Sequence, residues 1–160
     1  MAQRAVKKKT EPTLRVRAMQ ALARREYSRA ELRVKLLPHA GETDEVDAVL
    51  DGLVARGWLS DARALDQTIS TRRARFGTQR IAHELRQKGI SDDLISAALP
   101  QLKQGELEAA REVWQKKFAS PPQDQKEKNR QMRFLQSRGF SMEVILKVMR
   151  LSSGSEDDVF

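Results

Sequence analysis

The sequence predicts an all-α protein, because residues that favour strands are scarce and apolar residues recur at helical spacing. Aromatic residues make up only 5% of the 160 residues, and there are 8 glycines and 5 prolines, fewer than all-β or disordered chains usually have. Leu14, Ala18, Ala21 and Leu22 lie three or four residues apart, as on one helix face. The same spacing recurs along the chain. It predicts about nine helices, at residues 13–25, 29–37, 43–56, 60–75, 78–88, 91–102, 105–118, 125–138 and 141–150.

Capping residues mark the expected helix starts, and glycines mark the ends. Ser28 and Glu31 have the capping-box spacing, in which serine and glutamate satisfy each other's free backbone N–H groups. A hydroxyl residue also precedes acidic residues at Thr43, Ser60, Ser91 and Ser141, which favours the positive end of a helix dipole. At helix ends we expect glycine in the left-handed conformation, at Gly41, Gly57, Gly89 and Gly139.

The chain resembles itself at an offset of about fifty residues. Residues 85–91 (LRQKGIS) align with 135–141 (LQSRGFS), each with a helix end, a glycine turn and a capped start. The first segment joins at an offset near 49, with Leu36 over Leu85 and Val46 over Ile95. We therefore predict three tandem three-helix repeats with helix-turn-helix-like units, in an elongated, curved array. The predicted parts are a basic mobile arm (1–12), repeats at 13–58, 59–103 and 104–150, and an acidic disordered tail (151–160).

The composition argues against several classes of chemistry. The chain has no cysteine, which excludes disulfides, thiolate zinc sites and a cysteine nucleophile. His83 and Glu84 begin a zinc-protease pattern, but Gln87 stands where the second histidine is required, and His39 has no ligands nearby. No phosphate-loop or Ser-His-Asp pattern is visible either. We therefore expect no enzyme activity, metal or cofactor.

The sequence also predicts where the protein resides and in what form. No apolar run approaches the ~18 residues of a membrane span, and the start of the chain lacks the apolar region of a signal peptide. We expect a cytoplasmic monomer without membrane contact.

An excess of basic residues points to an anionic partner. Lys and Arg number 30 against 22 Asp and Glu, a net charge of +8, so the partner is nucleic acid or an acidic protein surface. Two internal basic clusters fall at matching places in the second and third repeats. Arginines on one helix face can bind carboxylates or phosphates through paired hydrogen bonds, although a solvated basic face is the alternative. The candidate partner-binding residues are Arg24, Arg25, Arg72, Arg73, Arg75, Arg80, Arg86, Lys88, Arg130, Arg133 and Arg138.

Aromatic residues fit a core better than a surface that stacks on bases. Trp114 and Phe118 share an apolar helical stripe with Leu107. Phe140 stands in a turn, where it either fills the repeat or protrudes.

Four blocks along the chain carry a family resemblance. They are ALARREYSRAELRVKL at 21–36, LVARGWLSD at 53–61, RARFGTQRIAHELRQKGI at 73–90 and RFLQSRGFS at 133–141. This ordered set resembles the RecX family of RecA regulators over about residues 14–150. The chain departs from the family pattern at 61–66, where an aromatic followed by a small residue is usual, and in a connector at 120–125.

The resemblance implies a protein that binds the RecA filament on single-stranded DNA, in its helical groove. It also implies inhibition of ATP hydrolysis, strand exchange and the stimulated repressor cleavage of the SOS response. Weak direct contact with single- or double-stranded DNA is expected as a secondary activity.

Two other functions compete with this interpretation. The first is a non-specific DNA-binding protein that competes for DNA, since residues 85–98 resemble a helix-turn-helix. Its would-be recognition helix, 91–99, begins with two aspartates and carries no Arg, Asn or Gln to contact a base. The second is a purely structural helical scaffold, which explains the positive charge poorly.

Overall fold

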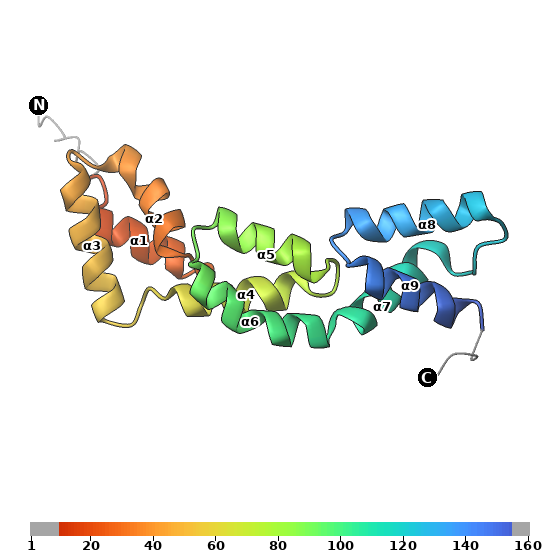
Figure 1. The fold of residues 1–160 in the computed structure, drawn as a ribbon. Coiled ribbons are helices and arrows are strands. Elements are labelled where there is room, and N and C mark those ends of the chain that lie inside the picture. Colours follow the sequence, from red (N-terminus) through yellow and green to blue (C-terminus); the bar gives the residue numbers. More distant parts are fainter. Residues whose placement is uncertain (1–9, 155–160) are drawn as a thin grey trace, which may run out of the picture. The chain divides into compact units, whose positions relative to one another are not determined.

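The computed structural model describes residues 10–154, with Asp44 as backbone only, and every regular element in this range is a helix (Figure 1). This confirms the all-α prediction, and the predicted helix boundaries agree to within three residues. Most of the predicted arm and tail falls on residues 1–9 and 155–160, outside the described part of the chain. The helices are α1 (Leu14–Leu22), α2 (Arg29–Leu36), the 3₁₀ turn η1 (Leu37–His39), α3 (Thr43–Ala55), α4 (Asp61–Arg72), α5 (Thr78–Gln87), α6 (Asp92–Gln104), α7 (Glu106–Phe118), α8 (Gln125–Ser137) and α9 (Met142–Ser152).

Most of the predicted caps are confirmed. Ser28 Oγ accepts from the Glu31 N–H at 3.1 Å, and Glu31 Oε1 accepts from the Ser28 N–H at 3.0 Å. Ser91 and Ser141 cap α6 and α9 through their hydroxyl groups. The left-handed glycines are found at three of the four predicted positions. Their φ angles are 74° at Gly57, 73° at Gly89 and 86° at Gly139.

Two predictions about helix ends are wrong. Gly41 does not have a positive φ, because Pro38 turns the chain into η1 after α2 and the helix ends before the glycine is reached. Thr43 does not cap α3: it is the first helical residue, and Glu42 takes the cap position without a side-chain hydrogen bond. In addition, α7 ends at Ala119, which has a left-handed φ of 59° although it is not glycine.

Helix α6 runs through Pro100 and ends two residues later than predicted. A proline inside a helix leaves the carbonyl four residues earlier without its usual donor. That carbonyl belongs to Ser96, and both Ser96 and Pro100 are exposed, so water can bind it. The proline therefore does not end the helix.

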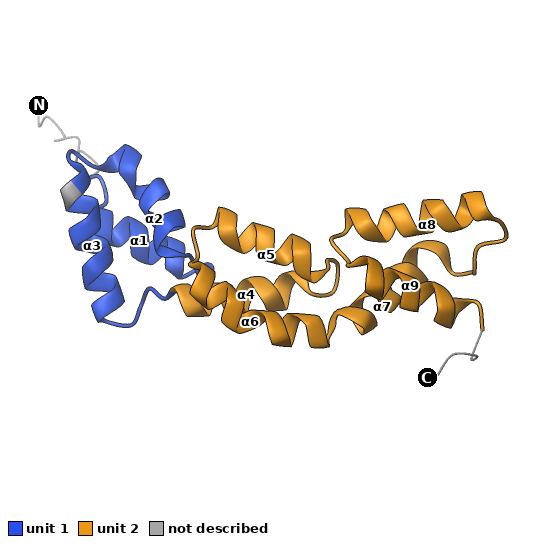
Figure 2. Ribbon diagram, in the orientation of Figure 1, with its two compact units in different colours: residues 1–60 blue, residues 61–160 orange. Residues whose placement is uncertain are grey.

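The chain divides into two compact units, residues 1–60 and 61–160 (Figure 2). In the first unit, α1, α2 and α3 bury one cluster of apolar side chains. Arg33 of α2 pairs with Asp47 of α3 at 3.1 Å, and Arg29 pairs with Asp51 at 2.6 Å. The buried cluster consists of Leu14, Ala18, Ala21, Leu32, Leu36, Val46, Leu50, Leu53 and Leu59.

The second unit contains two apolar clusters, one under α4, α5 and α6 and the other under α7, α8 and α9. Leu85 and Leu135 occupy matching positions in the two clusters, and both side chains are fully buried. Ile95 and Ile145 also match, and they are 3% and 0% exposed. Phe140 is 1% exposed and fills its cluster. The chain forms two compact units and not three, so its division into three repeats stays a prediction.

The two clusters of the second unit are joined by direct backbone contact between two turns. The Gly77 N–H before α5 donates to the Arg138 carbonyl at 2.8 Å, and the Gln79 N–H donates to the Gly139 carbonyl at 3.2 Å. A Cβ on Gly77 would overlap the backbone of Gly139, and a Cβ on Gly139 would overlap Arg80. Glycine at both positions allows the two turns to approach this closely. We call this contact the Gly77–Gly139 junction.

Truncation of Leu85 to alanine tests the core. Because Leu85 is fully buried in the cluster under α4, α5 and α6, Leu85→Ala is expected to lower the free energy of unfolding by about 2–5 kcal/mol. Chemical denaturation measures this loss. Val34 is 70% exposed, so Val34→Ala serves as the control and should change the free energy by less than about 0.5 kcal/mol. Equal effects of the two changes would contradict the assigned core.

Substitution of Gly77 tests the junction. Gly77→Ala places a methyl group into the backbone of Gly139 and is expected to lower the melting temperature of the second unit, because overpacking costs about 1–3 kcal/mol. The matched control is Gly52→Ala in the interior of α3, where a Cβ meets nothing within 4 Å. Alanine there should stabilise the helix by about 0.5–1 kcal/mol. A melting temperature that Gly77→Ala leaves unchanged would mean that the turns do not touch.

Candidate anion-binding surface

Three of the predicted binding residues have partners within their own helical unit. Arg25 pairs with Glu31 at 3.1 Å and stacks on the Tyr27 ring at 3.6 Å. Burial alone would lower the pKa of Arg25, but Glu31 and Tyr27 outweigh it and raise the pKa above its ordinary value. The other two, Arg72 and Lys88, bond to Glu84 at 3.1 Å and to Thr68 Oγ1 at 2.9 Å.

Arg73 lies partly inside the protein. Its guanidinium lies against Gly105: a Cβ placed on Gly105 would be 3.5 Å from Arg73 Nε. Nη1 and Nη2 are buried and have no hydrogen-bond partner among the described residues. Burial lowers the pKa of Arg73, and the charge of Glu106 acts in the opposite direction. This environment favours packing at the start of α7 over contact with a partner.

Arg80 and Arg138 meet over one aromatic ring at the Gly77–Gly139 junction. The Arg80 guanidinium lies 4.1 Å from the centre of the Phe76 ring, and that of Arg138 lies 5.5 Å from it. Arg80 Nη1 also donates to the Ser137 carbonyl at 3.3 Å. The junction therefore brings two cations from two different core clusters to one ring.

The same arrangement continues along α8. Arg138 lies 5.2 Å from the Phe134 ring and Lys117 lies 5.6 Å from it. Phe134 packs edge-to-face on Phe118 at 5.3 Å, and Arg130 lies 5.8 Å from the Phe118 ring. A chain of cation–ring and ring–ring contacts thus runs from Arg80 in α5 to Arg130 in the middle of α8. We call this set the cation–aromatic strip: Arg80, Phe76, Arg138, Phe134, Lys117, Phe118 and Arg130.

No ion pair within the described part of the chain neutralises the four cations of the strip. Cation–π contacts at exposed sites contribute about 0.5–1 kcal/mol each, which is enough to favour one side-chain orientation. A guanidinium that lies over a ring leaves its N–H groups at the edge free to donate to an oxyanion. The strip therefore has the chemistry of an anion-binding surface.

Four other predicted residues are exposed arginines, one in the first unit and three in the second. They form no ion pair with any residue between 10 and 154. They are Arg24, Arg75, Arg86 and Arg133.

The sequence predicted the arginines of the strip as binding residues and its phenylalanines as core residues, and all three rings do pack against the apolar clusters of the second unit. Phe76, Phe118 and Phe134 are only partly buried. The spacing of four residues in Phe76–Arg80 and in Phe134–Arg138 is a signal that could have suggested these two cation–ring contacts, although Phe76 lies just before α5 and Arg138 just after α8. Nothing in the sequence reveals that Arg138 reaches Phe76, because that contact depends on the junction.

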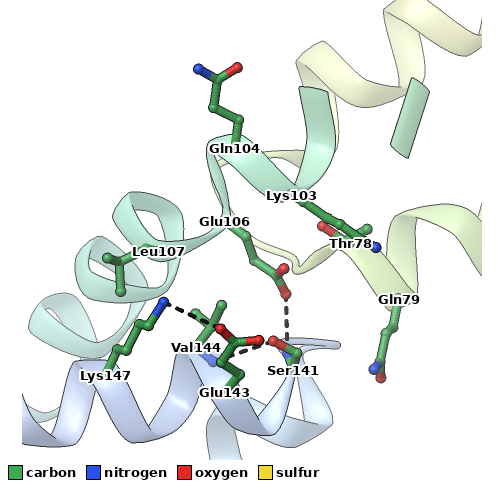
Figure 3. A pocket seen from close by; sticks show the side chains of 10 residues that line it. All are labelled: Thr78, Gln79, Lys103, Gln104, Glu106, Leu107, Ser141, Glu143, Val144 and Lys147. Carbon is green, nitrogen blue, oxygen red and sulfur yellow. Dashed lines mark hydrogen bonds and ion pairs between the residues drawn. The ribbon is translucent and has the colours of Figure 1, made fainter. Parts of the chain in front are cut away.

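A pocket of about 600 Å³ lies between α5, α6, α7 and α9 (Figure 3). Glu106 is buried here, and its Oε1 accepts from the Ser141 N–H at 3.1 Å, which fixes the start of α9. Glu143 bonds to Lys147 at 3.4 Å across the lower rim (Figure 3). Lys103 is the other cation of the lining, so two lysines face two glutamates. Balanced charge makes this pocket a weaker anion site than the strip.

Within residues 10–154, no three His, Asp or Glu side chains come together as metal ligands would. His39 and His83 are both exposed. No helix in the same range is long and apolar enough to cross a bilayer.

Comparison with known proteins gives matches over nearly the whole chain. Models of the second and third three-helix domains of RecX match residues 60–99 and 104–149. A regulatory protein RecX from Leptothrix cholodnii is 50% identical over 91% of this chain and 92% of its own length. A second one, from Chromobacterium violaceum, is 45% identical over 92% of this chain and 95% of its own length.

Solved structures show the same fold. The crystal structure of RecX from Lactobacillus salivarius has a TM-score of 0.74 at 17% identity and covers 88% of this chain and 94% of its own. A crystal structure of regulatory protein RecX has a TM-score of 0.71 at 20% identity, over 84% and 70% of the two chains. With relatives of up to 50% identity along nine-tenths of its length, this chain belongs to the RecX family of regulatory proteins.

Proposed function

We propose that this protein is a non-enzymatic regulator that binds the RecA filament on single-stranded DNA and inhibits its ATPase, strand-exchange and coprotease activities. Its membership of the RecX family supports this role. The observation that carries the proposal is the cation–aromatic strip, in which four cations without ion-pair partners among the described residues lie over three aromatic rings. Such a surface suits an assembly of protein and nucleic acid that is rich in anionic groups.

The predicted repeats suggest how binding becomes inhibition. Three repeats can each contact a different subunit along a helical groove, and weak contacts then add through effective concentration. A ligand shifts a conformational equilibrium only by its differential affinity for the two states. Inhibition therefore requires tighter binding to an inactive or dissociating filament, or a steric block of incoming duplex.

We divide the predicted binding residues into two groups. Arg80, Arg130 and Arg138 form the centre of the binding surface, and the exposed arginines at 75, 86 and 133 of the same unit add to it. Arg24 contributes separately from the first unit. The second group acts mainly through the fold because of its internal contacts. It consists of Arg25, Arg72, Arg73 and Lys88.

Direct competition for DNA is the alternative, and the unpaired cations of the strip also favour it. Against a helix-turn-helix reading, Asp92 and Asp93 are exposed in the first turn of α6, the helix that would enter the major groove. Phosphates would repel this end. We therefore rank non-specific DNA competition second.

Titration of RecA's single-strand-dependent ATP hydrolysis tests the proposal. The protein is added well below one molecule per RecA subunit, at two salt concentrations, and its affinity for bare DNA is measured in parallel. We expect inhibition at substoichiometric amounts that persists at the higher salt, because a filament-directed regulator does not depend on counterion release alone. Inhibition that requires saturation and disappears with salt would support competition for DNA instead.

A further inference from the structure

We propose that the acidic segment at residues 156–160 (EDDVF) docks into a groove between α8 and α9 of its own chain and competes there with outside ligands. The groove has a volume of about 580 Å³ and includes the last turn of α9. The contact requires no RecA, so its failure would leave the proposed function untouched. We call this surface the α8–α9 groove, and it is lined by Pro122, Lys128, Leu146, Met149, Arg150 and Ser153.

The α8–α9 groove combines cations with apolar side chains, and none of its described lining residues carries a carboxylate. Lys128 of α8 forms no ion pair with any residue between 10 and 154. Arg150 enters the lining from the last turn of α9. Beside them Leu146 is 40% exposed, although it is a large apolar residue. A lining of this kind fits a ligand that carries both carboxylates and apolar groups.

The acidic segment carries both kinds of group in a short stretch. Residues 156–158 are acidic (EDD), and residues 159–160 are apolar (VF). Carboxylates form charge-assisted hydrogen bonds with a guanidinium such as that of Arg150. Valine and phenylalanine side chains placed against Leu146 and Met149 remove apolar surface from water. The segment therefore matches the groove in charge and in apolar character.

The end of α9 directs the chain toward the groove. Gly154, directly after the cap residue of α9, has a left-handed φ of 68°. A left-handed glycine at this position commonly brings the next backbone N–H to the carbonyl of the third-last helical residue, which is Arg150. A residue spans at most ~3.3–3.6 Å, so residues 155–160 reach no farther than about 20 Å from Gly154. The groove begins beside this glycine, at Ser153.

Tethering favours the groove of the same molecule over that of a second copy. Only Ser155 separates the acidic segment from Gly154. A short linker gives a tethered ligand an effective concentration of millimolar order, above that of the protein in dilute solution. The docked segment covers Leu146. An outside protein segment of the same acidic and apolar character then gains the groove only by displacing it.

Backbone amide order parameters of residues 156–160 test the proposal in the full chain. An order parameter near 0.85 marks a rigid backbone, and a value below about 0.6 marks a flexible one. Docking predicts values above about 0.6 for the wild type. Asp157→Lys combined with Asp158→Lys should lower them below about 0.6, because like charges then face each other in the groove. A flexible segment in the wild type would overturn the proposal.

Charge exchange tests which cations hold the segment. Lys128→Glu combined with Arg150→Glu should release it, and adding the two tail lysine substitutions to this variant should restore the order parameters. Arg111→Gln combined with Lys116→Gln removes two cations from exposed positions of α7 outside the groove and should change nothing. Circular dichroism verifies that the helices remain. Low order parameters in the combined variant with intact helices, or equal release by the α7 control, would contradict docking at this groove.

A peptide with the sequence of residues 154–160 (GSEDDVF) tests the competition. Added to the full chain that carries the two tail lysine substitutions, it should shift the amide signals of Lys128, Leu146 and Arg150. The wild type should bind the peptide about tenfold more weakly, because a segment docked in about nine-tenths of the molecules leaves one-tenth of the grooves open. Equal affinity for the two chains would overturn the proposal. So would wild-type order parameters that fall on dilution, since the segment would then occupy a second copy.

Discussion

The close approach of two glycine turns, at Gly77 and Gly139, is the constraint on which the candidate surface depends. Two backbone hydrogen bonds, Gly77 N–H to Arg138 O and Gln79 N–H to Gly139 O, cross from one apolar cluster to the other. No side chain fits between the two turns at this point, because a Cβ on Gly77 would overlap the backbone of Gly139 and a Cβ on Gly139 would overlap Arg80. Glycine is therefore a requirement of packing at both positions, and at Gly139, where φ is 86°, of turn conformation as well.

The surface follows from this contact. Phe76 stands directly before Gly77, and Arg138 stands directly before Gly139, so the junction that joins the turns also places the Arg138 guanidinium over the Phe76 ring. Arg80 completes the group from the first turn of α5. A fixed cluster of cations is thereby assembled from segments about sixty residues apart in sequence. Its lack of carboxylate partners in the described chain is a cost to the isolated protein that an anionic partner offsets.

Signals within a few residues of one another in the sequence predicted the helices well, but they could not predict contacts between segments that are far apart in the sequence. Apolar periodicity located the helices, and Ser28, Ser91 and Ser141 marked real caps because a cap is made within four residues. Gly41 misled because Pro38 had already ended the helix in a 3₁₀ turn. The arginines of the strip were predicted from their density alone. Their rings and their mutual contact were not, because Phe76 and Arg138 meet only after the two clusters pack.

Amide hydrogen exchange at Gly77 and Gln79 tests the central claim most directly, because these N–H groups make the two bonds of the junction. If the second unit is held together as described, both amides exchange slowly, with protection comparable to that of core amides in α5 such as Leu85. Exchange at the rate of an unprotected amide, while α5 and α8 remain protected, would show that the turns do not bond. The arginines would then lack the fixed arrangement from which the anion-binding surface is inferred.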